Sequence, residues 1–340
     1  MPQQFNKICI AAMLAATSVA ASAQSSVTIF GTVDAGLTRL TGSKGSVTGV
    51  STSNANISRI GFRGIEDMGG GLKAQFWLEA GYDVDTGNGK TGGALSFNRR
   101  STISLMNDYG ELRMGRDDSA TFLNTLIFDP FLTNGVGGTM SFIMLGAPIQ
   151  LARTISYFTP DLNGFYAQAQ YASADTAPAA AGRQGRYLGA RGGYRKGPLH
   201  VAGATGELQN ATPALDVRAT NIAATYDFGF VRPAAIWATE RNGTTKITAL
   251  QLGVTVPIGV TDIRAQVSHY DTANSNADWN KYAIGLGYNL SKRTMLYGTV
   301  AHISNKAGAS KAVGAMGLTA PGTTLGSSSS GYEVGIRHFF

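Results

Sequence analysis

Residues Leu72 to Asp83 decide the fold class; they read Leu-Lys-Ala-Gln-Phe-Trp-Leu-Glu-Ala-Gly-Tyr-Asp. Apolar side chains occupy every second position from Leu72 to Tyr82, and mostly polar residues lie between them. Successive side chains of a β-strand point to opposite faces, whereas an amphipathic helix needs apolar residues three and four apart. The stretch therefore predicts a strand with one apolar face and one polar face.

The same period of two recurs along the chain in segments of about ten residues. The connections alternate between tight Gly, Asp, Asn or Pro turns and longer polar loops, a pattern typical of bacterial outer-membrane barrels. The segments predict sixteen strands, at residues 26–40, 57–65, 72–84, 96–106, 110–116, 153–159, 164–173, 185–195, 198–207, 217–228, 230–240, 245–256, 259–271, 279–290, 293–304 and 331–340.

The N-terminus carries the pattern of a secretory signal peptide. Lys7 precedes a short apolar stretch at residues 8–16, and small residues follow up to Ala23. We expect cleavage between Ala23 and Gln24, so that residues 1–23 are removed after export. The apolar stretch is too short for a membrane helix, which needs about 20 apolar residues.

Residues 24–340 are expected to form one all-β domain, an antiparallel transmembrane barrel. No segment in this range reaches the length of a membrane helix, and the mean hydropathy of −0.02 fits strands that are apolar at only every second position. The chain has a formal net charge of +7, but its basic residues are mostly scattered arginines rather than clusters interleaved with aromatics. This pattern disfavours nucleic-acid binding and indicates a basic lining.

One connection, residues 117–152, is long and unusually apolar. It contains Asp129-Pro130-Phe131, a glycine-rich stretch at residues 135–138 and several large apolar side chains. A segment that folds back into the barrel would bury those side chains against the inner wall and narrow the pore.

Several motifs together resemble the trimeric general porins of Gram-negative bacteria, in the branch of β-proteobacterial and neisserial porins. The most specific match runs from Ser58 to Ala74, which resembles that family's second strand, turn and third strand. The resemblance extends over residues 24–340, and the other matching segments are residues 26–36, 97–100, 112–116 and 331–340.

The resemblance implies a sixteen-stranded homotrimeric barrel whose third loop folds inward, so that arginines of the wall face carboxylates in a constriction. On the basic side it implies Arg59, Arg99 and Arg153, with Arg63, Arg100 and Arg116 as neighbours. On the acidic side we expect Asp117, Asp118, Asp129, Glu79 and Asp83. Strict alternation turns Arg100 to the pore and Arg99 to the lipid. Either a bulge interrupts the alternation, or Arg100 is the arginine that lines the constriction.

The loop departs from enteric relatives, which carry a Pro-Glu-Phe-Gly-Gly stretch at its tip. The loop carries three acidic residues, Asp117, Asp118 and Asp129, which are fewer than the arginines expected on the wall. At the C-terminus, Tyr332 and Phe340 match the signal read by the barrel-assembly machinery. Aromatics such as Tyr82, Phe158, Tyr166, Tyr226, Tyr288, Tyr297 and Phe340 are interpreted as residues of the membrane-interface girdles.

The expected function is a water-filled channel for passive diffusion of ions and small hydrophilic solutes through the outer membrane, with a preference for anions, so inorganic anions are expected partners. No cofactor, metal or catalysis is expected. Lipid, lipopolysaccharide and further copies of the chain are the expected neighbours. The four histidines lie on distant strands without metal-like spacing, and no G-x-S-x-G motif occurs, which argues against a barrel enzyme. A soluble lectin would need a second sheet to cover the apolar faces. A substrate-selective channel on the same fold remains the alternative.

Overall fold

The structure is a computed structural model that describes residues 26–90, 93–138, 144–174 and 182–340. The predicted cleavage site at Ala23 and Gln24 lies outside these residues. The strands are β1 (Ser26–Gly42), β2 (Gly45–Thr52), β3 (Arg59–Gly69), β4 (Leu72–Gly81), β5 (Arg100–Asn107), β6 (Gly110–Asp118), β7 (Gln150–Phe158), β8 (Phe165–Ala172), β9 (Tyr187–Lys196), β10 (Leu199–Leu208), β11 (Val217–Tyr226), β12 (Arg232–Asn242), β13 (Thr245–Ile258), β14 (Thr261–Thr272), β15 (Trp279–Asn289), β16 (Thr294–Asn305) and β17 (Ser329–Phe339).

Among the described residues, two helical elements accompany the strands, α2 (Ala120–Phe128) and the 3-10 turn η2 (Pro213–Leu215). Within the described ranges, no helix has the length and hydropathy to cross a membrane.

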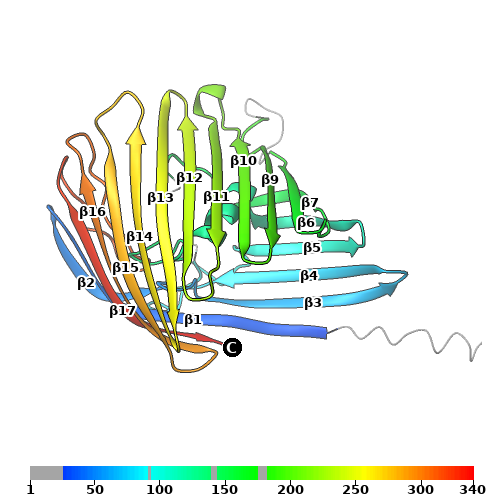
Figure 1. The fold of residues 1–340 in the computed structure, drawn as a ribbon. Coiled ribbons are helices and arrows are strands. Elements are labelled where there is room, and N and C mark those ends of the chain that lie inside the picture. The colour runs from blue at the N-terminus through cyan, green and yellow to red at the C-terminus, as the bar shows by residue number, and fades with distance from the viewer. Residues whose placement is uncertain (1–25, 91–92, 139–143, 175–181) are drawn as a thin grey trace, which may run out of the picture.

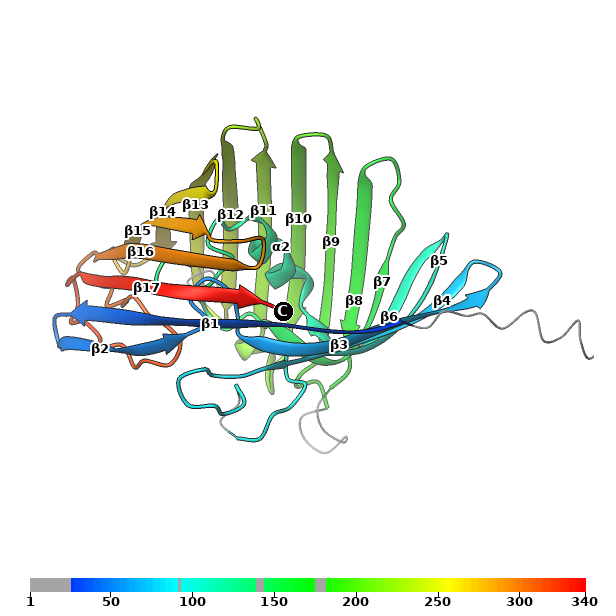
Figure 2. The same ribbon diagram turned by 90° about the horizontal axis from the view of Figure 1, so that it is seen from below.

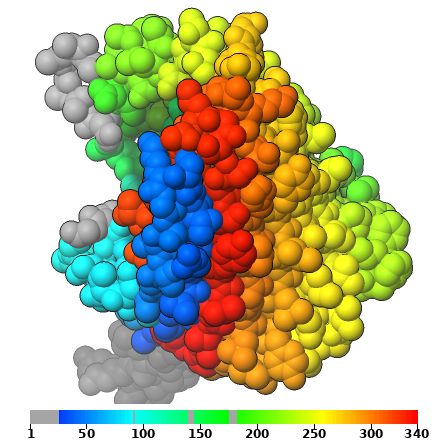
Figure 3. Space-filling view, turned by 90° about the vertical axis from the view of Figure 1, so that its left-hand side faces the viewer, coloured from blue at the N-terminus to red at the C-terminus, as the bar shows by residue number. Residues whose placement is uncertain are grey.

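The strands form a closed antiparallel barrel (Figures 1 and 2). From β3 onward each strand pairs with the next along the chain, and β17 returns to β1 through pairs such as Gly36 with Gly335. In Figure 3 the blue first strands lie directly beside the red last strand. Closure leaves no unpaired sheet edge, which a strand in lipid could not tolerate.

One edge of β1 pairs with β17, and two strands pair one after the other with its second edge. Residues Ser26–Thr32 pair with β3, and residues Ala35–Gly42 pair with β2. Strands β2 and β3 are therefore two halves of one interrupted strand, and the ring is sixteen strands around. The Asp34 carboxylate accepts hydrogen bonds from the backbone N–H groups of Asn54, Ala55 and Asn56 in the interruption.

The two faces of the wall separate as the alternation predicts. On β14 and β15, Val267, Ile284 and Leu286 are exposed on the outside, where lipid would solvate them. Ser268, which follows Val267, and Lys281 on β15 are buried on the inside. Apolar residues outside and polar residues inside reverse the arrangement of a water-soluble protein.

The predicted strands agree with the structure to within about four residues at each end. The sequence interpretation missed three of the described elements, β2, α2 and η2. It was also wrong about two tyrosines of the proposed girdles. The Tyr297 hydroxyl donates to Asp34 inside the wall at 2.6 Å, and the Tyr166 hydroxyl lies 2.8 Å from the His200 ring nitrogen and accepts from Arg191.

Helix α2 packs against the polar face of β8 to β12. We call the described residues between β6 and β7, 119–138 and 144–149, the α2 segment. Ser119 caps α2 by accepting from the Phe122 N–H at 3.2 Å. The Asn124 amide donates to Asn221 on β11 at 2.7 Å, and Arg191 on β9 donates to the Asn124 carbonyl oxygen at 2.9 Å. Figure 2 shows α2 within the ring of strands.

Candidate pore constriction

Arginines of β3, β5 and β6 gather on the inner face of the wall, on either side of β4. Arg59 begins β3, Arg100 begins β5, and Arg113 and Arg116 lie on β6. Arg59 is paired across the strands with Gly81, where a Cβ atom would come within 3.1 Å of the Arg99 side chain. The absent side chain at position 81 thus leaves room for the aliphatic part of Arg99. We call the six arginines the basic wall; they are Arg59, Arg63, Arg99, Arg100, Arg113 and Arg116.

Glu79 on β4 links two of these arginines. Its carboxylate accepts a hydrogen bond from Arg99 Nε and lies 3.6 Å from Arg59 Nε. Arg99 precedes the start of β5, so it escapes the strict alternation that would turn it to lipid. This resolves the ambiguity between Arg99 and Arg100, because both side chains lie inside and are mostly buried.

Arg100 and Arg113 share a second carboxylate. Arg113 Nη1 donates to Asp117 at 2.6 Å, and Arg100 Nε lies 3.7 Å from the other Asp117 oxygen. Arg113 also donates to both oxygens of Glu111. These bonds hold the guanidinium groups in one orientation, as bidentate pairing does in general.

Trp77 on β4 adds an aromatic surface to the basic wall. Its ring lies 4.4 Å from the Arg100 guanidinium carbon and 5.4 Å from that of Arg63. Such contacts between a guanidinium group and a π-face are attractive, so both arginines are favoured in positions next to the ring.

The predicted acidic side is distributed differently from the expectation. Asp117 and Asp118 end β6 on the same side as the arginines, and Gln150 donates to Asp118 at 2.7 Å. The buried Asp129 carboxylate accepts from the backbone N–H groups of Phe131 and Thr133, which fixes the turn after α2. The carboxylates near the arginines therefore pair with them at short range rather than facing them across the lumen.

The remaining predicted residues are more peripheral. Asp83 pairs with Lys90 at 3.2 Å in the connection after β4. Arg153 lies in β7 at a bulge opposite Arg116, is exposed and has a φ of 55°. Arg153 is therefore not part of the basic wall, because the bulge interrupts the alternation at this position.

A cavity of about 390 Å³ separates the basic wall from the α2 segment. On one side it is lined by Arg59, Arg99 and Arg116, with Lys90 nearby. On the other side it is lined by apolar side chains that include Phe122, Leu126, Leu132 and Ile149. A solute in this space would meet positive charge on one side and hydrocarbon on the other.

Charged side chains from three strands hold the segment in place beyond α2. Glu240 on β12 accepts from the backbone N–H of Met144 at 2.6 Å and from that of Ala147. Glu333 on β17 accepts from the Val136 N–H at 3.0 Å, and Lys281 on β15 donates to the Gly138 carbonyl oxygen. The sequence interpretation missed these anchors and Arg113, although each is a charged residue at an inward position of a predicted strand.

Comparisons with known proteins agree with this architecture. Residues 11–308 match the family model described as "Gram-negative porin". The chain is 36% identical to outer membrane porin protein 32 of Delftia acidovorans, over 98% of this chain and 99% of the relative. It is 27% identical to a major outer membrane protein P.IB of Neisseria meningitidis serogroup B, over 98% and 99%.

One solved structure is similar to this chain at a comparable sequence identity. The anion-selective porin from Comamonas acidovorans superposes with a TM-score of 0.87 at 35% identity, covering 93% of this chain and 100% of that one. The family model covers well over half of the sequence, and the likeness to the Delftia protein covers nearly all of it. The chain therefore belongs to the Gram-negative porin family.

Proposed function

We propose that this chain forms a water-filled channel for the passive diffusion of ions and small hydrophilic solutes, with a preference for anions. As a porin it is an integral, multi-pass β-barrel of the outer membrane of a Gram-negative bacterium. The observation that carries the anion preference is the basic wall, in which the guanidinium groups of six arginines meet only four carboxylates. The similar structure from Comamonas acidovorans is itself named an anion-selective porin.

The α2 segment is the proposed constriction loop. It packs on the polar face of β8 to β12 and leaves the cavity beside the basic wall as the narrow part of the passage. Arginine stays protonated under all ordinary conditions, so the positive charge there does not depend on pH. Charged groups that line a pore set which ions enter it. Anions would be concentrated beside Arg59 and Arg99, and cations would be depleted.

Reversal potentials in a salt gradient across a planar bilayer test this proposal. Arg59→Ser and Arg99→Ser are expected to lower the anion preference, each by removing one positive charge from the cavity lining. Arg153→Ser is the matched control, because Arg153 lies at the bulge outside that lining and its loss is expected to change selectivity little. A cation preference in the wild-type channel would contradict the proposal.

The neighbours of the channel are proposed from the family and from the sequence. Residues 1–23 are the proposed signal peptide, residues 24–340 the barrel, and Tyr332 and Phe340 part of the signal for the assembly machinery. We propose a homotrimer in contact with lipid and lipopolysaccharide, and no enzymatic activity. Cross-linking in native membranes would test the trimer, and N-terminal sequencing of the purified protein would test cleavage before Gln24.

A further inference from the structure

Three basic residues form a row on the outer face of the barrel, at one end of three adjacent strands. Arg218 is the second residue of β11, Arg241 is the last but one of β12, and Lys246 is the second of β13. Arg218 is paired across the strands with Arg241, and Arg241 with Lys246. All three side chains are exposed. We call these residues the outer basic row; their strands stand side by side in Figure 1.

The alternation along these strands places the outer basic row on the lipid side of the wall. Trp237 lies four residues before Arg241 on β12 and is 40% exposed on the same face. Its cross-strand partners, Ile222 and Leu250, are exposed apolar residues as well. Four residues of a strand span about 13 Å. Aromatic residues mark the membrane interface of such barrels, so the outer basic row lies beyond the apolar band, at the level of the lipid headgroups.

A row of hydroxyl groups separates the apolar residues from the basic ones. Thr239 lies midway between the two on β12, and its cross-strand partners are Thr220 and Thr248. Thr205 on β10 extends the row, because its hydroxyl lies 2.9 Å from that of Thr220. The outer face therefore changes from apolar through hydroxyl to cationic along the strands. Acyl chains, sugar hydroxyls and phosphates of a phosphorylated glycolipid follow one another in the same order.

This end of the strands is the outer side of a porin. The long connections at residues 209–216 and 306–328 lie at this end, and the two-residue turn at 259–260 lies at the other. Long loops of outer-membrane barrels face the outside of the bacterium. The outer basic row therefore meets the outer leaflet of the membrane.

The outer basic row holds more positive charge than its protein neighbours neutralise. Glu207 on β10 pairs with Arg218 at one end of the row. Arg241 Nε donates to the Gly243 carbonyl oxygen in the adjoining turn at 3.0 Å, which orients the guanidinium group. No hydrogen bond between described residues uses its Nη groups or the Lys246 ammonium. Like charges directly opposite one another on adjacent strands repel, and an anion placed between them would remove the repulsion.

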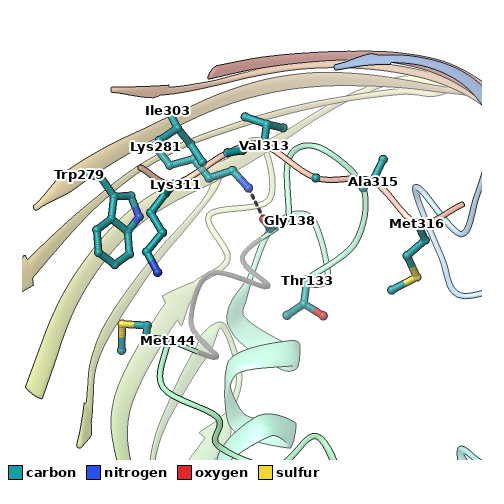
Figure 4. A pocket seen from close by; sticks show the side chains of 13 residues that line it. Thr133, Gly138, Met144, Trp279, Lys281, Ile303, Lys311, Val313, Ala315 and Met316 are labelled. Carbon is teal, nitrogen blue, oxygen red and sulfur yellow. Dashed lines mark hydrogen bonds between the residues drawn. The ribbon is translucent and has the colours of Figure 1, made fainter. Parts of the chain in front are cut away.

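Lys246 differs from a lysine on the lumen side of the wall. Lys281 on β15 is buried and donates to the Gly138 carbonyl oxygen (Figure 4). Lys246 is exposed, and the neighbouring strand pairs its acidic residue, Asp271, with Thr248 instead. Lysine side chains at a membrane interface extend toward the headgroups, where they attract anionic lipid. Lys246 is therefore placed to reach a lipid phosphate.

We propose that the outer basic row binds the phosphate groups of a phosphorylated glycolipid of the outer leaflet. Phosphate oxygens accept hydrogen bonds from guanidinium and ammonium groups, and the acyl chains would lie over Ile222, Trp237 and Leu250. A second copy of the chain would bring the same positive charge to this face and be repelled. The inference deepens the proposed contact with lipopolysaccharide and rests on it, but it does not depend on the anion preference of the channel.

The fixed cations have a consequence for the role of metal ions. Divalent cations bind phosphate and carboxylate oxygens and can bridge neighbouring anionic headgroups. Beside the outer basic row, protein side chains supply the positive charge. Binding of the glycolipid to this face is therefore expected to persist in EDTA.

Native mass spectrometry of the detergent-solubilised barrel with bisphosphoryl lipid A, in EDTA, tests the site. We expect saturable binding, and weaker binding of the dephosphorylated glycolipid. Arg241→Gln and Lys246→Gln are each expected to weaken binding about fivefold, the order of one cation at an anionic membrane surface. Lys246→Arg keeps the charge and is expected to bind as the wild type does. Lys196→Gln is the control, because Lys196 is an exposed lysine at the opposite end of the wall, where β9 ends.

The proposal is overturned if the dephosphorylated glycolipid binds as tightly as bisphosphoryl lipid A, or if EDTA abolishes binding. It is also overturned if the double variant of Arg241 and Lys246 binds as well as Lys196→Gln. Equal binding by all variants would refute the site alone, whereas no binding by the wild type would also refute the proposed contact with lipopolysaccharide. Reversal potentials in chloride are expected to be the same in all variants, because the row lies outside the lumen; a shift would contradict this placement.

Discussion

Replacing Glu79 with Gln removes one negative charge from the basic wall and keeps the shape of the side chain. The Glu79 carboxylate lies within ion-pair distance of Arg59 and Arg99, and its side chain is only 10% exposed. A glutamine still offers a carbonyl oxygen to Arg99, so both arginines are expected to stay in place. The net charge at the cavity then rises by one unit.

The size of the effect follows from Coulomb's law. A unit charge about 8 Å from a permeating ion contributes about 0.5 kcal/mol in water, and screening at 0.1 M salt reduces this by roughly half. The change favours anions and disfavours cations equally. The ratio of anion to cation permeability is therefore expected to rise about twofold at 0.1 M salt and about fourfold at 0.01 M.

Reversal potentials at the two salt concentrations measure this ratio. Glu66→Gln is the control, because Glu66 is exposed near the turn that follows β3 and is far along the strand from Glu79. A ratio that stays constant in Glu79→Gln, or that rises equally in Glu66→Gln, would refute the argument that Glu79 tempers the field of the basic wall.

Three further outcomes are expected. Glu240→Gln weakens two bonds to the constriction segment, at a cost of about 1–3 kcal/mol, and single-channel records are expected to show more brief closures. Gly31→Ala places a Cβ atom against the ring of Phe340 and 2.7 Å from the backbone oxygen of Arg59, so the fraction of the protein that runs on gels as heat-modifiable folded barrel is expected to decrease. Gly203→Ala brings the new Cβ atom no nearer than 3.7 Å to another atom, so this variant is expected to fold normally. Hydrogen bonds from Arg183 hold the pKa of Asp216 below its usual value, so Arg183→Gln raises that pKa in a carbon-13 NMR titration. The pair stabilises the outer loops at neutral pH, and this contribution is lost as the pH falls through the lowered pKa.

The barrel could be predicted from the sequence because a period of two needs only local information. Each strand shows the alternation by itself, and the tight turns mark where the chain reverses. Strand β2 was missed because Gly45–Thr52 is short, glycine-containing and almost free of large apolar residues. Its partner is the far half of the long strand β1, which no local pattern reveals.

The candidate constriction was only partly predictable. The inward positions of Arg59 and Arg100 follow from the alternation, but the position of Arg99 depends on where β5 begins and on the space left by Gly81. The roles of the acids could not be read from composition. Asp129 stabilises a turn through backbone N–H groups, whereas Glu240 and Glu333 bind a segment about a hundred or more residues away in the chain.

The meeting of the two ends of the chain has a consequence for the order of folding. The Gly31 N–H donates to the Phe340 carbonyl oxygen, and the Phe340 N–H donates back to Gly31. Until the final residue is available, the first and last strands each present an open edge that could add foreign strands. Every earlier hairpin can form while the chain is still being delivered, but the cylinder itself cannot. A transport system that releases this polypeptide piecemeal must therefore shield the leading edge until the trailing one arrives.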